Sequence, residues 1–98
     1  MKDSSNQFHS ILYKRNPNAI LVDEAEKKTL FQSETCEYID LNETAFSIWQ
    51  AMDSPSDLES ICKRIGFIYE KEIDDILPDV KEWLCAATEK KIVSSSLI

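Results

Sequence analysis

Three cysteines and one histidine are the residues of this 98-residue sequence that could bind a metal ion or carry out thiol chemistry. They are Cys36, Cys62, Cys85 and His9, and no two of the cysteines form a Cys-x-x-Cys pair. A structural zinc site takes about four nitrogen or sulfur ligands, so the sequence predicts no metal site within one chain. An odd number of distant cysteines also disfavours a disulfide framework, which indicates a reducing, cytoplasmic environment.

Carboxylates are the other candidates for chemistry. Asp74 and Asp75 are adjacent, but neighbouring residues on a helix point in different directions and cannot act together as an acid and a base. No nucleophile with a matching base accompanies them, and a single glycine leaves no glycine-rich phosphate loop. The sequence therefore predicts a protein that is not an enzyme, with no catalytic residue and no cofactor.

The charge of the chain restricts its partners. Eighteen acidic residues stand against eleven basic ones, which gives a net charge of −7. Nucleic acids and anionic membrane surfaces bind proteins through Lys and Arg, so neither is an expected partner. A cationic peptide or protein face would be attracted. The polar N-terminus has no apolar segment of the signal-peptide kind, and no apolar run is long enough to cross a membrane.

The length predicts one domain. Residues 1–18 are rich in Ser and Asn and close with Asn16-Pro17-Asn18, which is typical of a flexible N-terminal arm. The arm has four apolar residues with which it could dock as a short extended piece: Phe8, Ile11, Leu12 and Tyr13. Residues 19–98 would form the folded domain.

Three short apolar clusters come first in the domain, at residues 19–22, 29–32 and 36–41. The separating segments, 23–28 and 33–35, are charged or polar and compatible with turns. Short strands separated by such turns predict a three-stranded antiparallel meander.

Three amphipathic helices follow. The first has Asn42 as its N-cap and an apolar stripe at i, i+3, i+4 and i+7 from Ala45. The second begins at Ser54-Pro55 or at the box of residues 56–59, and is expected to end at Gly66. The fold class is therefore α+β.

The third helix is the longest. If Asp75 is its N-cap, Pro78 occupies the third helical position, where its missing N–H costs nothing. Lys90 and Lys91 would close the helix at its negative end, and Ile92-Val93 would add a short extended tail.

Three segments, LNETAFSIWQAM, SDLESICKRI and DVKEWLCAATEKKIV, together resemble the PqqD-like family. These small winged-helix proteins recognise the precursors of ribosomally synthesised, post-translationally modified peptides. The matching pairs are Leu41-Asn42, Thr44-Ala45, Ile48-Trp49, Asp79-Val80 and Trp83-Leu84. The resemblance covers residues 19–93, and the form Leu-Asn-x-Thr-Ala-x-x-Ile-Trp is most similar to the discrete leader-binding proteins of lasso peptide biosynthesis. Two glycines of the family pattern are missing here, at Lys91 and in the turn of residues 24–28.

The resemblance implies a winged helix-turn-helix-like fold, with a three-stranded antiparallel sheet followed by three helices. It also implies that the third strand is an exposed edge, to which a leader peptide adds as a fourth strand in a cleft beside the third helix. We expect Tyr38 and Leu41 to face the core or the cleft wall, and Glu37, Ile39 and Asp40 to present the edge. The predicted peptide-binding residues are Glu37, Tyr38, Ile39, Asp40 and Leu41 on the strand, and Leu77, Lys81, Leu84, Cys85 and Thr88 on the helix.

Two functions from different classes follow. The first is a non-catalytic adaptor that binds the leader of a precursor peptide and delivers it to a separately encoded enzyme, with a lasso-type leader peptidase favoured over other modifying enzymes. The alternative is a winged-helix DNA-binding regulator. The charge disfavours the alternative, because a recognition helix needs outward-facing basic residues and the helix at 56–65 offers Lys63 and Arg64 alone.

Overall fold

The computed structural model describes residues 11–24 and 26–97. Phe8 and His9 lie outside the described residues. In chain order the elements are β1 (Ile11–Arg15), β2 (Ala19–Glu24), β3 (Lys27–Gln32), β4 (Glu37–Leu41), α2 (Glu43–Ala51), α3 (Leu58–Tyr69), α4 (Ile73–Glu89) and β5 (Val93–Leu97).

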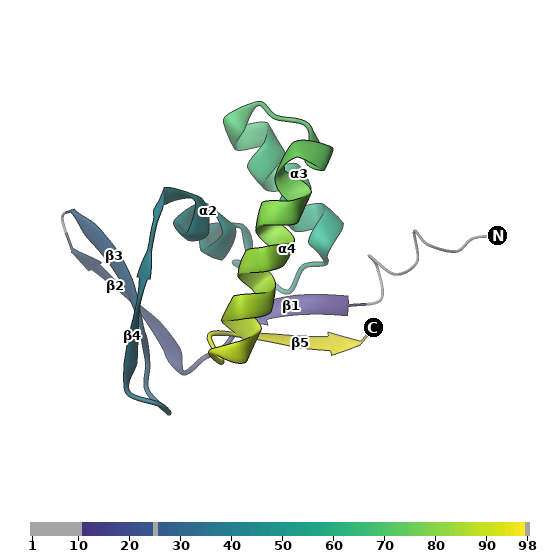
Figure 1. Cartoon of the computed structure of the whole chain (residues 1–98). Coiled ribbons are helices and arrows are strands. Elements are labelled where there is room, and N and C mark those ends of the chain that lie inside the picture. The colour runs from purple at the N-terminus through teal and green to yellow at the C-terminus, as the bar shows by residue number, and fades with distance from the viewer. Residues whose placement is uncertain (1–10, 25, 98) are drawn as a thin grey trace.

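The described strands form two separate antiparallel sheets. One has three strands in the order β2-β3-β4, and the other pairs β1 with β5. Figure 1 shows the three-stranded sheet at one end of the molecule, with α4 running between it and the β1–β5 pair. The predicted α+β class, the three-stranded antiparallel meander and the three helices are confirmed.

Strand β1 lies within the segment predicted as a flexible arm and has neighbours on both sides. Its first side carries β5, in a register that pairs Ile11 with Leu97. On its second side Tyr13 exchanges two backbone hydrogen bonds with Ser56, at N···O distances of 2.8 and 2.9 Å. The Arg15 side chain donates to the Trp49 carbonyl at the C-terminal end of α2, where the helix dipole favours a cation. These contacts hold residues 11–15 on the domain.

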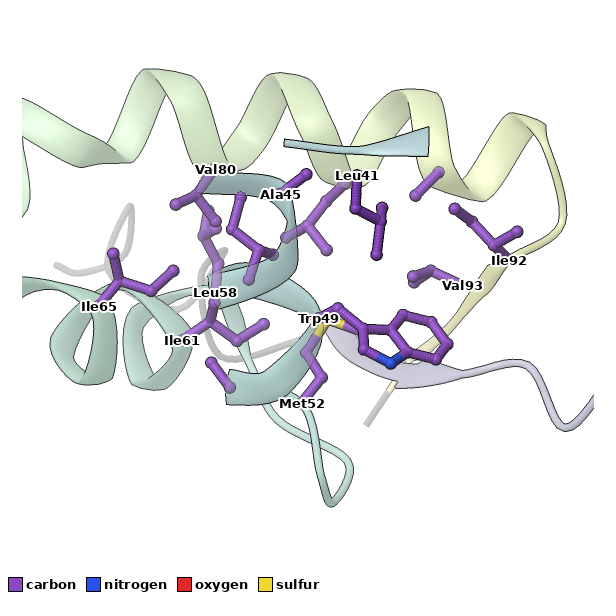
Figure 2. Packing of buried hydrophobic residues seen from close by; sticks show 14 of the residues in the cluster. Leu41, Ala45, Trp49, Met52, Leu58, Ile61, Ile65, Val80, Ile92 and Val93 are labelled. Carbon is purple, nitrogen blue, oxygen red and sulfur yellow. The ribbon is translucent and has the colours of Figure 1, made fainter. Parts of the chain in front are cut away.

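One hydrophobic core joins the helices to both sheets. The predicted stripe of α2 is buried, and α3 and α4 contribute Ile61, Ile65, Val80 and Leu84 to the same cluster. Figure 2 shows Ile61, Ile65 and Val80 toward one end of the cluster, and Leu41 of β4, Ile92 and Val93 toward the other end, on the side of Trp49. The two sheets therefore have no core of their own, and the helices are what hold them together.

Helix α3 does not end at Gly66 as predicted but continues to Tyr69. The left-handed residue that ends it is Glu70, at φ 55°. Gly66 has a different role, because a Cβ atom built on it would lie 2.8 Å from the carbonyl oxygen of Lys71. The Lys71 N–H also donates to the Gly66 carbonyl, at 2.9 Å. The absence of a side chain at Gly66 lets the chain turn back closely against the helix.

Helix α4 begins two residues before the predicted cap. Its N-cap is Glu72, which makes no side-chain capping bond, so Asp75 lies within the first turn. Pro78 is then inside the helix rather than among its first three positions. Its missing N–H removes one helical hydrogen bond, at an exposed position where water can replace it.

The turn from α4 to β5 forms without the glycine of the family pattern. Lys91 adopts φ 63°, and two hydrogen bonds, from Lys91 N to Thr88 O and from Ile92 N to Ala87 O, give the Schellman arrangement. The Lys91 carbonyl accepts from Asn16 Nδ2 at 2.7 Å and from the buried Gln32 side chain. These contacts tie the turn to both sheets and hold the left-handed residue in place.

Substituting Gly66 tests the close approach of the Lys71 carbonyl. In an ordinary helix interior Gly→Ala stabilises by about 1 kcal/mol. Here we expect Gly66→Ala to destabilise the fold by about 1–3 kcal/mol, because the backbone must move to admit a methyl group. Urea unfolding followed by circular dichroism measures the change. Gln50→Ala, at an exposed helix position, is the control, and a Gly66→Ala protein at least as stable as the parent would contradict the explanation.

The three thiols should differ in reactivity. Cys36 and Cys85 are exposed and Cys62 is fully buried, and burial raises the pKa of the Cys62 thiol to about 11. We expect two thiols to react with Ellman's reagent at pH 8, and the third only after unfolding. Because the folded pKa lies above the unfolded value, this thiol supports stability below the unfolded pKa, and its contribution falls as the pH rises through the folded pKa. Equal rates for all three thiols would contradict this placement.

Candidate peptide-binding site

Strand β4 is an edge of the three-stranded sheet. It pairs with β3 on one side, and no other described strand pairs with it. The described part of the N-terminal segment, β1, is bonded to β5 and Ser56 and so does not cover this edge. Among the described residues, therefore, no strand pairs with one row of backbone donors and acceptors on β4, and a further strand could bind there.

The register indicates which residues present that open row. Two residues join β2 to β3, with Glu24 opposite Lys27, and a two-residue turn closes on a hydrogen-bonded pair. Hydrogen-bonded and non-hydrogen-bonded pairs alternate along both ladders of the sheet. Counting from Lys27, the backbone groups of Tyr38 and Asp40 point away from β3, and those of Ile39 point towards it.

Side-chain contacts agree with this alternation. Side chains lie closer in non-hydrogen-bonded pairs. The Phe31 and Tyr38 ring centroids are 4.8 Å apart, and the Thr29 hydroxyl donates to Asp40 Oδ1 at 3.2 Å. Ile39, which we expected to present the edge, therefore directs its backbone groups to β3, whereas those of Tyr38 and Asp40 point to the open side.

The end of β4 is fixed by the first residue after it. Asn42 follows Leu41 directly and caps α2, with its side-chain oxygen 2.8 Å from the Ala45 nitrogen. Its carbonyl accepts from Phe46 N at 2.9 Å. Leu41 is buried in the core. The open strand therefore cannot swing independently of the helix, and its donors and acceptors are held in position before any partner arrives.

An open cleft of about 460 Å³ lies between the start of α2 and one flank of α4. The α2 side consists of the cap and first turns, with Ala45 and Ile48, which are buried in the core, at its base. The α4 side has two carboxylates and a half-buried indole. The lining residues are Asn42, Thr44, Ala45, Ile48, Asp79, Glu82, Trp83 and Ala86.

The charge of this cleft has one sign. Asp79 and Glu82 are the ionisable groups in its lining, and both are exposed. Neither makes an ion pair with another residue of the described ranges. Asp40 on β4 differs, because Lys27 Nζ lies 3.4 Å from its Oδ2. The cleft can therefore receive an apolar group over Trp83 and a cation beside the two carboxylates.

The predicted α4 wall lies on the wrong side of the helix for this cleft. At about 100° per residue, Leu77, Lys81 and Cys85 point roughly opposite to Asp79, Glu82 and Trp83. Leu84 is 1% exposed and belongs to the core, and Thr88 bonds back to the Leu84 carbonyl. Burial raises the pKa of the Tyr13 phenol, and the nearby Cys85 raises it further, so Cys85 lies on the β1 side of α4. None of these five residues lines the cleft.

The prediction of two inward-facing residues on β4 was half wrong. Leu41 is buried, but Tyr38 is 70% exposed, whereas Ile39 packs against the core. Alternate residues of a strand face opposite sides of the sheet, so Tyr38 and Leu41 cannot share a face. Glu37 and Asp40 are exposed as expected for an edge.

Sequence reasoning missed the residues of the α4 flank, although a signal for them existed. Asp79, Glu82, Trp83 and Ala86 repeat at i, i+3, i+4 and i+7 and so form one continuous helix face. The core stripe lies between this face and the predicted one. The signal for the cleft flank of α4 is therefore an aromatic residue with acidic residues beside it on one face of the helix.

A larger hollow, about 590 Å³, lies between α2 and α3 and is bordered by the exposed Phe67 and Ile68. It has no unpaired strand in its lining and would offer side-chain contacts without backbone hydrogen bonds. The described residues hold no group of three or more potential metal ligands, and no described helix is long and apolar enough to cross a membrane.

Comparison with known proteins gives one match. The model of the family described as Coenzyme PQQ synthesis protein D (PqqD) matches residues 28–93. This span covers more than half of the chain and contains β3 apart from Lys27, β4 and the three described helices. Comparisons with curated proteins and with solved structures gave no match.

The Asn42 cap can be tested by substitution. Asn42→Ala should destabilise the protein by about 1 kcal/mol because the Ala45 N–H loses its acceptor, whereas Asn42→Asp, which keeps a capping oxygen, should retain most of the stability. Denaturant unfolding measures both. Equal losses for the two variants would mean that the cap does not hold this junction.

Proposed function

The chain belongs to the PqqD family, and from this premise we propose that it captures the leader segment of a precursor peptide by strand addition to β4. Membership of the family indicates a peptide-binding adaptor in the biosynthesis of ribosomally made, modified peptides, and its members are accessory proteins rather than enzymes. The proposal includes the winged-helix arrangement of the family. The observation that carries it is the open edge of β4 beside a cleft.

Strand addition fits this edge in three respects. The backbone of Tyr38 and Asp40 can bond an incoming strand, and alternate side chains of that strand then reach opposite faces. The inner face of the new strand would look towards the cleft lined by Trp83. Because Asn42 fixes β4 beforehand, the protein loses little conformational freedom on binding.

The expected affinity is moderate. One side chain buried in the cleft contributes roughly 1.5–3 kcal/mol, and the new backbone hydrogen bonds add to this. Ordering a flexible leader costs roughly 2–5 kcal/mol. These terms largely offset each other, so a micromolar complex, which corresponds to about −8 kcal/mol, needs more than one anchoring side chain along with the backbone hydrogen bonds.

We propose that the enzyme receiving the peptide is a separately encoded leader peptidase of the lasso type. The support is the form Leu41-Asn42 followed by Thr44-Ala45 and Ile48-Trp49, which resembles the discrete proteins of that pathway. In the structure these residues form the β4–α2 junction and line part of the cleft.

Proline at the open edge gives a direct test. Tyr38→Pro and Asp40→Pro each remove an N–H that points to the incoming strand, so each should weaken leader binding at least about tenfold, corresponding to roughly one lost charge-free hydrogen bond. The probe is a fluorescent leader peptide from the precursor gene beside this one, titrated by anisotropy. Circular dichroism should show unchanged helix content.

Asp23→Pro is the matched control, because it makes the same backbone change on β2, at the opposite edge of the sheet. It should bind the leader as the parent does. If the parent shows no binding at tens of micromolar, or if the control and the β4 variants lose affinity equally, strand addition at β4 is wrong.

A further inference from the structure

A row of apolar side chains crosses the outer face of the three-stranded sheet and stops at its open edge. Ile20 of β2 lies opposite Phe31 of β3, and Phe31 lies opposite Tyr38 of β4. The Phe31 and Tyr38 rings are in contact. Ile20 and Tyr38 are 53% and 70% exposed, which is unusual for large apolar side chains in one row.

A fourth strand would extend this row by one residue. Cross-strand neighbours on one face lie about 4.5–5.5 Å apart between their Cβ atoms, and aromatic pairs are among the most favourable. The side chain that the incoming strand places beside Tyr38 would therefore cover the exposed part of its ring. A polar residue there would leave the ring in water and lose that contact.

The inner face of the same strand meets a different environment. There the cleft offers the half-buried Trp83 and the exposed Ala86 as apolar surface, together with the carboxylates of Asp79 and Glu82, which form no ion pair with another described residue. Lys and Arg suit such a surface, because their aliphatic stems cover apolar atoms while their charged ends reach the acids. The net charge of −7 favours the approach of a basic peptide further.

We infer that the peptide which adds to β4 carries an apolar, preferably aromatic, residue beside Tyr38 and a Lys or Arg beside Asp79 and Glu82. Since successive residues of a strand face opposite sides, the two are separated by an odd number of positions. This inference rests on the proposed function and names the chemistry of its partner. The outer face of the bound strand would thus contact Tyr38 of β4, and its inner face would contact the flank of α4 that carries Asp79 and Glu82.

Selection from randomised linear peptides displayed on phage tests this pattern with the full chain as bait. Peptides whose binding is abolished by Asp40→Pro, which removes an N–H of the open edge and leaves the Tyr38 ring in place, are the ones that use the edge. Most of them should share an apolar or aromatic residue and a Lys or Arg at an odd separation. Edge-dependent peptides that lack either residue, or that place the two at even separations, would overturn the inference and leave the proposed function standing.

Two substitutions then assign each half of the pattern. Glu82→Lys should weaken a selected peptide at least about tenfold in low salt, with a smaller effect in high salt, and Glu89→Lys, also on α4 but outside the cleft, should not. Tyr38→Thr should weaken it by about three- to five-fold, the scale of one cross-strand pair, and Val22→Thr, on the far strand of the same sheet, should not.

The substitutions and the peptide selection test the residue pattern and the proposed function separately. Equal losses for Glu82→Lys and Glu89→Lys would show that charge acts through the whole molecule, and would overturn the assignment of the basic residue. If no selected peptide depends on the β4 edge and the leader itself does not bind, the proposed function fails, and the inference fails with it.

Discussion

The pairing of β1 with β5 leaves the outer edge of β4 without a partner among the described strands, and the rest of the structure depends on this arrangement. The first and last described strands, β1 and β5, pair with each other, and β1 uses its second side for Ser56. No described strand remains to cover β4. An uncovered edge normally risks aggregation, and here it is short, carries Glu37 and Asp40, and adjoins a cleft. The domain thus keeps an open edge while limiting the surface that another sheet could use.

The cleft exists because the elements on its two sides are fixed independently. Asn42 joins β4 to α2 without a loop, so the strand moves with the helix. Helix α4 is positioned by its packing on α3 and by the turn at Lys91, whose carbonyl is held by Asn16 and Gln32. The lysine at this turn departs from the family pattern, yet the turn forms because tertiary hydrogen bonds offset the cost of a left-handed residue. The turn at Lys91 therefore depends on tertiary hydrogen bonds rather than on a glycine.

Local patterns in the sequence were sufficient for the meander and the helices, but not for strands β1 and β5. The alternating clusters predicted the meander, the i, i+3, i+4 stripes predicted three helices, and Asn42 was recognised as a cap. These features depend on residues within a few positions of one another, where side-chain period and capping chemistry decide the outcome. The order of the elements also placed an edge strand directly before the first helix, which located one side of the candidate site.

By itself, then, the sequence determined the three strands of the meander, the three helices, the capped junction and a net charge of −7. Tertiary structure decided which flank of α4 lines the cleft. Asp79 and Cys85 lie on the two sides of the core stripe, and the packing of α4 against α2 places the Asp79 side at the cleft. It also decided the pairing of β1 with β5 and the role of Gly66. Each of these depends on contacts between segments that are distant in the sequence, and no local pattern encodes such contacts. The period of a helix determines which residues share a face, but not which other element packs against that face.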